Sequence, residues 1–93
     1  MSKSVKVEKL SIDYPVTDEI VWGGHYAARI SAPYGEKVEV SIDKGKWIAC
    51  RNAAGHWWFD IYGLNEGAHS LAARITKDKR IAAVMRRFKV SQE

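Results

Sequence analysis

The segment from His56 to Tyr62 carries the side chains best suited to binding chemistry. Alternation along an extended strand places Trp58, Asp60 and Tyr62 on one face, with the two aromatic rings roughly 13 Å apart. Such a row could stack on sugar rings, with Asp60 accepting hydroxyl hydrogen bonds, or anchor a protein partner. A third interpretation is that a loop covers Trp58 and the row is structural. The other face is apolar and is expected in the core: Trp57, Phe59 and Ile61.

Trp47 joins the same expected interaction surface, although its orientation is ambiguous from the sequence. Strict alternation with an inward Ile48 and Cys50 points it outward. In a two-sheet protein, an outward Trp47 and an outward Trp58 would lie on different sheets and would not form one platform, which weakens the glycan interpretation. Trp22, just ahead of two glycines, is expected to plug one end of the core.

Basic residues concentrate in the C-terminal half. The chain has a net charge of +4, and residues 51–93 hold eight Lys/Arg against four Asp/Glu. Most of them lie on one expected C-terminal hairpin, from Arg74 to Lys89. We interpret this hairpin first as a solvated edge that blocks strand-to-strand aggregation, and second as a surface for an acidic protein. Nucleic acid is disfavoured because Phe88 is the only aromatic residue among the cations. The basic edge comprises Arg74, Lys77, Lys79, Arg80, Arg86, Arg87 and Lys89.

No pattern in the chain indicates catalysis, a cofactor or a metal. The three histidines, His25, His56 and His69, fall on separate expected strands, whereas a metal site needs several converging ligands. His69 shares the inward face with Leu71 and is expected to be a hydrogen-bonded core or edge residue. The single Cys50 allows no internal disulfide and is expected to be a buried, inert thiol. We therefore expect a protein that is not an enzyme.

Short alternating segments joined by Gly, Pro, Asn and Asp turns must position these side chains. Val16 to Gly24 reads as a connection, and a phase break in the last strand predicts a bulge at Arg86-Arg87 that turns Met85 and Phe88 both inward. The pattern predicts one all-β domain over residues 1–93, an immunoglobulin-like antiparallel β-sandwich of about seven strands. The expected strands are Val5–Ile12, His25–Ala32, Lys37–Asp43, Trp47–Arg51, His56–Tyr62, His69–Ile75 and Ile81–Val90.

Two stretches carry a family resemblance. Val38–Trp47 is a strand, an Asp-Lys-Gly turn and a tryptophan, and Glu66–Asp78 contains Gly-Ala-His-Ser-Leu-Ala-Ala-Arg. Together they resemble early-set immunoglobulin-like domains, which include the C-terminal dimerisation domain of sulfite-oxidase-like molybdenum enzymes and many bacterial accessory domains. The chain shows nothing that matches a molybdopterin or haem ligand and lacks the paired cysteines of antibody-type domains.

The resemblance implies an accessory or interaction domain that self-associates or docks on another protein. A carbohydrate-binding module that uses the exposed aromatic residues is the alternative. No apolar run approaches the roughly 20 residues of a membrane span, and Met1 to Lys6 lacks the apolar stretch of a secretory signal. As written, the chain is expected in the cytoplasm.

Overall fold

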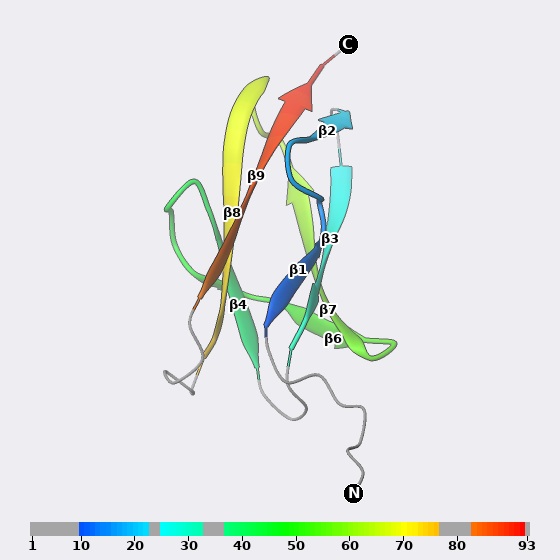
Figure 1. The fold of residues 1–93 in the computed structure, drawn as a ribbon, viewed down its shortest axis with the longest axis vertical. Helices are drawn as coiled ribbons and strands as arrows, with labels where there is room; N and C mark the ends of the chain where they lie inside the picture. Colours follow the sequence, from blue (N-terminus) through cyan, green and yellow to red (C-terminus); the bar gives the residue numbers. More distant parts are fainter. Residues whose placement is uncertain (1–9, 23–24, 33–36, 77–82, 93) are drawn as a thin grey trace, which may run out of the picture.

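The computed structural model describes residues 10–22, 25–32, 37–76 and 83–92, which form two β-sheets packed face to face (Figure 1). These residues contain nine strands, against about seven expected, and no helix that could cross a membrane. The four-stranded sheet has the order β1 (Ser11–Tyr14), β3 (His25–Ser31), β7 (His56–Tyr62), β6 (Arg51–Ala53). The five-stranded sheet has the order β2 (Glu19–Trp22), β9 (Val84–Ser91), β8 (Gly67–Ile75), β4 (Val38–Ile42), β5 (Ile48–Ala49).

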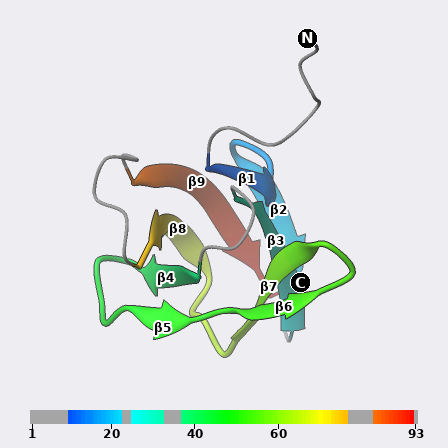
Figure 2. The same cartoon turned by 90° about the horizontal axis from the view of Figure 1, so that it is seen from below.

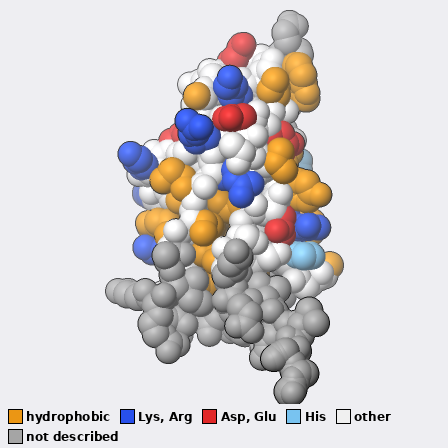
Figure 3. All heavy atoms as spheres, in the orientation of Figure 1, with side chains coloured by type: hydrophobic (Ala, Val, Ile, Leu, Met, Phe, Trp, Pro, Cys, Tyr) orange, Lys and Arg blue, Asp and Glu red, His pale blue; other side chains and the backbone are white. Residues whose placement is uncertain are grey.

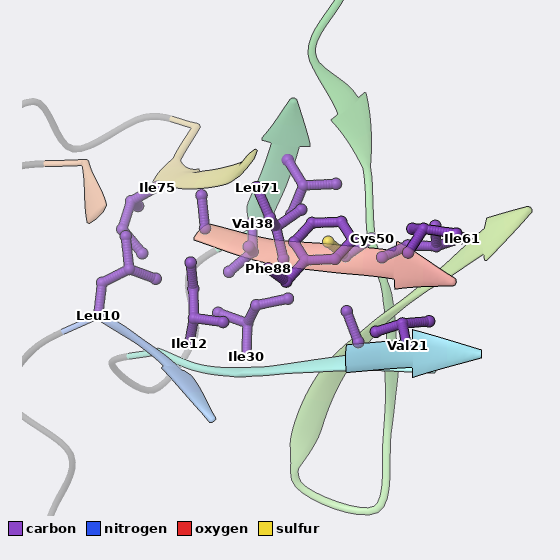
Figure 4. Close-up of a cluster of buried hydrophobic side chains, with 14 residues drawn as sticks. Leu10, Ile12, Val21, Ile30, Val38, Cys50, Ile61, Leu71, Ile75 and Phe88 are labelled. Carbon is purple, nitrogen blue, oxygen red and sulfur yellow. The ribbon is translucent and has the colours of Figure 1, made fainter. Parts of the chain in front are cut away.

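Apolar side chains from both sheets interdigitate to form a single core, as the alternation predicts (Figure 4). Ile30 of β3 and Leu71 of β8 are fully buried, and Phe88 of β9 is 1% exposed. Ile61 of β7 is also buried, and its neighbours Trp57 and Phe59 pack against the cluster, so the expected inner face of this strand is confirmed. Burying each such large side chain contributes about 1.5–3 kcal/mol to folding, so this interface is the main source of stability.

The stretch expected as a connection between the first two strands contains β2. This strand pairs in parallel with β9, from Glu19 opposite Phe88 to Trp22 opposite Ser91. The sandwich is therefore not wholly antiparallel. Val21 faces the core at 5% exposure, while Trp22 is 60% exposed, so the expectation that Trp22 plugs the core is wrong.

The segment Trp47–Arg51, expected as one strand, is divided between the two sheets. β5 pairs with β4, whereas β6 pairs with β7 of the opposite sheet, and Figure 2 shows the two strands following one another across the edge of the sandwich. Cys50 lies at the crossing, is buried, and donates its backbone N–H to Val38 O at 3.0 Å. Ile48 is 47% exposed, so its predicted inward orientation is wrong.

Strand β9 alternates regularly along its whole length. Phe88 and Val90 face the core, and the pairing with β8 runs without a shift from Val90 to Val84, so the predicted bulge at Arg86-Arg87 is wrong. Met85 is 57% exposed because it lies in phase with the outward residues of the strand. β9 also lies between β2 and β8, so it is not the edge strand that the basic pattern suggested. The predicted residues 5–9 and 77–82 lie outside the described residues.

Candidate functional site

The outer face of the four-stranded sheet carries three of the four residues expected in an interaction surface, namely Trp58, Asp60 and Tyr62. Asp60 lies near the C-terminal end of β7, opposite Ala27 of β3. Its carboxylate accepts a hydrogen bond from His25 Nε2 at 2.9 Å and a second, short one from Arg51 Nη1. The hydrogen bond from Arg51, followed by that from His25, lowers the pKa of Asp60 against the opposing effect of its partial burial. Asp60 is therefore an ionised, fixed acceptor that links strands β3, β6 and β7.

Exposed aromatic residues gather beside Asp60 at one end of the sandwich. Tyr62 is 66% exposed, and its ring centroid lies 5.1 Å from that of His25. Trp22, from β2 of the other sheet, lies with both around a shallow hollow whose floor is apolar. Sequence reasoning missed Trp22 and His25 as surface residues. The signal for Trp22 was available in the alternation of Ile20, Val21 and Trp22, which places only the valine inward.

Trp58 is less available than the sequence suggested. Its side chain is half-buried, and its indole Nε1–H donates to Ala53 O at 2.9 Å across the β6–β7 turn. Its ring meets His56 edge-on, with centroids 6.3 Å apart. The three residues of the predicted row therefore differ in how available they are to a ligand. Tyr62 is exposed, Asp60 is hydrogen-bonded to His25 and Arg51, and Trp58 packs against its own β6–β7 hairpin.

A second carboxylate organises the other end of this face. Asp13 Oδ2 accepts hydrogen bonds from Arg29 Nε at 3.1 Å and from Ser31 Oγ at 2.6 Å, and His56 Nδ1 lies 3.9 Å away. The Arg29 guanidinium also lies over the Tyr14 ring, 4.9 Å from its centroid. Each acid of this face is thus paired with an arginine. Among the described residues, no three His, Cys, Asp or Glu side chains converge in a way that could hold a metal ion.

Trp47 lies on the opposite sheet, so the two tryptophans form no common platform. Its ring is half-buried under Arg74 of β8, whose guanidinium carbon is 4.1 Å from the ring centroid. Arg74 in turn donates to Glu39 Oε1 from Nε at 2.9 Å and from Nη2 at 2.8 Å. The cation and the acid hold the indole in a fixed orientation.

The expected basic edge does not form one continuous patch among the described residues. Arg74 is engaged by Glu39, and Arg86 points inward and donates Nη1 to Pro15 O at 2.9 Å. Arg87 and Lys89 are exposed on the outer face of β9. Lys77, Lys79 and Arg80 lie outside the described residues.

No protein-family model matches the chain, and no curated protein matches it either. Solved structures do match. An endo-β-1,4-mannanase from Thermotoga petrophila superposes with a TM-score of 0.73 and 16% identity over 98% of this chain. The fibronectin(III)-like modules of Clostridium thermocellum CbhA superpose with a TM-score of 0.69 and 16% identity over 89% of this chain and 97% of theirs.

The fold is a fibronectin-III-like, immunoglobulin-like sandwich. The expected all-β fold class is thereby confirmed, while identities this low carry no further property from one protein to the other. The chain spans about a fifth of the length of the mannanase, 21% of that chain. The finer resemblance, to the dimerisation domain of sulfite-oxidase-like enzymes, stays a prediction.

Proposed function

We propose that this chain is a non-catalytic interaction module, a single domain that self-associates or docks on another protein. The observation that supports this most strongly is the exposed aromatic cluster at the end of the sandwich. Trp22 and Tyr62 expose 60% and 66% of their surface around one apolar hollow. Large aromatic side chains at such positions are typical anchors of protein interfaces, because they bury much area and lose little conformational entropy.

The polar neighbours of the cluster favour a specific contact over general stickiness. Asp60 is held by His25 and Arg51, so a partner meets a carboxylate and a guanidinium whose positions are already fixed. Such pre-organisation lowers the entropic cost of association. Tyr62 is the contact residue that we place first, followed by Trp22, with Trp58 in a supporting position, whereas Trp47 lies on the other sheet and takes no part in this contact.

Self-association is tested by light scattering over a range of protein concentrations. Wild type is expected to form a dimer that Tyr62→Ser and Trp22→Ser weaken. Ile48→Ser is the matched control, because Ile48 is a similarly exposed apolar residue at 47% that lies on β5, the far edge from β2. Equal loss of association in all three variants would contradict the assignment of the interface to this cluster.

Carbohydrate binding is the second candidate. The same exposed rings could stack on a sugar while the Asp60 carboxylate accepts its hydroxyl hydrogen bonds, and a domain of this fold forms part of a mannanase. Titration with a soluble β-mannan, followed by tryptophan fluorescence, tests it. A monomeric protein whose fluorescence shifts with mannan, and no longer shifts in Tyr62→Ser, would overturn the protein-interaction proposal in favour of this one.

A further inference from the structure

The outer face of the five-stranded sheet contains an open groove of about 340 Å³, on the opposite side of the sandwich from Asp60. Its floor is made of small side chains, since Ser41 of β4 lies opposite Ala72 of β8, and Ala72 lies opposite Met85 of β9. The larger side chains of Trp47 and Met85 lie on either side of that floor, and the hollow results from this difference in side-chain size. The full lining is Ser41, Lys44, Gly45, Trp47, Ala72, Ala83, Val84 and Met85.

One wall of the groove is fixed before any ligand arrives. Arg74 lies against the Trp47 ring and is itself hydrogen-bonded to Glu39. Ser41 Oγ donates to Gly45 O at 2.8 Å, which ties the hairpin of this wall to the floor. A Cβ atom at position 45 would lie 3.0 Å from the Ile42 carbonyl oxygen, a tight contact that favours glycine in this turn. Met85, on the other wall, is 57% exposed and unbranched, and can adapt to different occupants.

Two basic side chains lie at or near the groove in the part of the chain that the structure describes. Lys44 lines the groove, and Arg87 projects from the same face of β9, about 7 Å along the strand from Met85. Neither side chain makes an ion pair with any described residue, whereas the nearby Glu39 is neutralised by Arg74. Among the described residues, Glu39 of this face is therefore engaged, whereas Lys44 and Arg87 have no ion-pair partner.

We propose that this groove binds an acidic segment of a partner protein, with one aliphatic or methionine side chain seated between Trp47 and Met85. Carboxylates on either side of that anchor would meet Lys44 and Arg87. This site goes beyond the proposed function, which rests on the aromatic cluster of Trp22 and Tyr62 at the end of the sandwich.

Charge and groove chemistry argue against the other occupants. A second copy packed groove to groove would bring Lys44 and Arg87 against the same cations, and the net charge of +4 on each chain opposes association in general. Nucleic acid stacks its bases on several open aromatic faces. Here the lining offers one aromatic ring, Trp47, and one of its faces is covered by Arg74.

Methyl and indole NMR signals provide the test, because Met85 is one of only two methionines in the chain and Trp47 one of four tryptophans. The probe is a synthetic peptide of about 12 residues, rich in Glu, with a single central Leu, which spans the groove when extended. Its two controls replace the Leu by Ser and every Glu by Lys. The Glu/Leu peptide is expected to shift the Met85 methyl and Trp47 indole signals saturably, while each control peptide binds at least about tenfold more weakly.

Matched protein variants separate this groove from the aromatic cluster. The pair Lys44→Gln and Arg87→Gln is expected to weaken peptide binding about tenfold, and Met85→Ser to weaken it similarly. Tyr62→Ser, on the other sheet, is expected to leave peptide binding unchanged while it weakens the association assigned to the aromatic cluster. The two proposals can therefore fail separately.

Four results would overturn the proposal. The first is equal binding of the Glu and Lys peptides, and the second is no shift of the groove signals with the Glu/Leu peptide at millimolar concentration. The third is a shift of the Met85 signal with a short oligothymidine in place of the peptide. The fourth is a concentration-dependent Met85 shift with protein alone, which would assign the groove to self-association.

Discussion

His69 offers the sharpest test of the side-chain geometry, because both of its ring nitrogens face acceptors. Nδ1 lies 2.6 Å from Asp43 Oδ2 and Nε2 lies 2.6 Å from Asn65 O. Neither a carboxylate nor a carbonyl can donate, so both hydrogen bonds form only when the ring is a protonated imidazolium. The ring is also stacked on Phe88, with centroids 5.8 Å apart, and its side chain is only 12% exposed.

The charged form of His69 stabilises the fold in a defined pH range. Burial lowers the pKa of His69, but the hydrogen bonds to Asp43 and to the Asn65 carbonyl, together with the Asp43 charge, raise it by more. A raised folded-state pKa means that this stabilisation is complete below the unfolded value of about 6.5 and is lost as the pH rises through the folded value. The part of the fold that charged His69 stabilises is the hairpin that begins at Asp43. The Asp43 carboxylate also accepts a hydrogen bond from the Ser70 backbone N–H at 2.8 Å.

We expect His69→Gln to lower the free energy of unfolding by about 2 kcal/mol below pH 6.5. The amide keeps one hydrogen bond but loses a second, charge-assisted one of about 1.5 kcal/mol and the contact with Phe88 of about 0.5 kcal/mol or more. The lower value is used for the hydrogen bond because Asp43 is 44% exposed. For a domain of this size the loss corresponds to a fall in Tm of about 10 °C.

Thermal unfolding of wild type and His69→Gln, followed by circular dichroism between about pH 5.5 and 9, measures this difference. The gap in Tm is expected to narrow as the pH rises, because neutral His69 can donate only one hydrogen bond. His25→Gln is the control, since His25 is 52% exposed and makes one such contact, with Asp60, and its gap is expected to be small throughout. A difference in Tm between wild type and His69→Gln that stays constant or widens as the pH rises would refute the doubly hydrogen-bonded imidazolium.

Three further predictions follow from burial and charge. Burial, with a smaller effect of the Glu39 charge, raises the pKa of the Cys50 thiol to about 12, so native protein at pH 8 is expected to react with a thiol reagent at least about 100-fold more slowly than urea-unfolded protein. Leu71→Ala, at a fully buried position, is expected to destabilise the fold by about 2–5 kcal/mol in urea titrations, and a loss below 1 kcal/mol would contradict this packing. Because the pKa of Asp60 is lowered, the stability advantage of wild type over Asp60→Asn is expected above about pH 4 and lost as the pH falls through the folded value, whereas an advantage that persists in acid would contradict the pairing with Arg51 and His25.

Local alternation predicted the parts of this fold in which one strand has one buried face. His56 to Tyr62 is the clear case, because every second residue from Trp57 to Ile61 is apolar and the observed strand has the predicted bounds. Alternation does not say which sheet a strand joins. The residues on both sides of Cys50 have the sequence pattern of one continuous strand. Only their different pairing partners, β4 for β5 and β7 for β6, show that they are two strands. The partner of β2 is β9, more than sixty residues away, and nothing local indicates it.

The candidate site was predictable to the extent that it depends on side-chain direction. The outward orientation of Tyr62 follows from its place in the strand, but the engagement of Trp58 by Ala53 O depends on the shape of the β6–β7 turn. The interpretation of Asp60 changed most. The sequence offered it as a free acceptor for a ligand, whereas two neighbours from other strands already occupy it. Such cross-strand hydrogen bonds require the register, which the sequence does not give.

The two outer faces should respond differently to salt, and this separates their roles. On the four-stranded sheet, Asp13 and Asp60 are each paired with an arginine, so a contact through Tyr62 and Trp22 gains from apolar burial and little from net charge. On the five-stranded sheet, Lys44 and Arg87 flank an apolar groove without ion-pair partners among the described residues. Screening shortens the reach of exposed charges to about 8 Å at physiological ionic strength. Added salt should therefore weaken an acidic ligand at the groove while leaving association through the aromatic cluster nearly unchanged, so a single salt titration assigns an observed interaction to one face or the other.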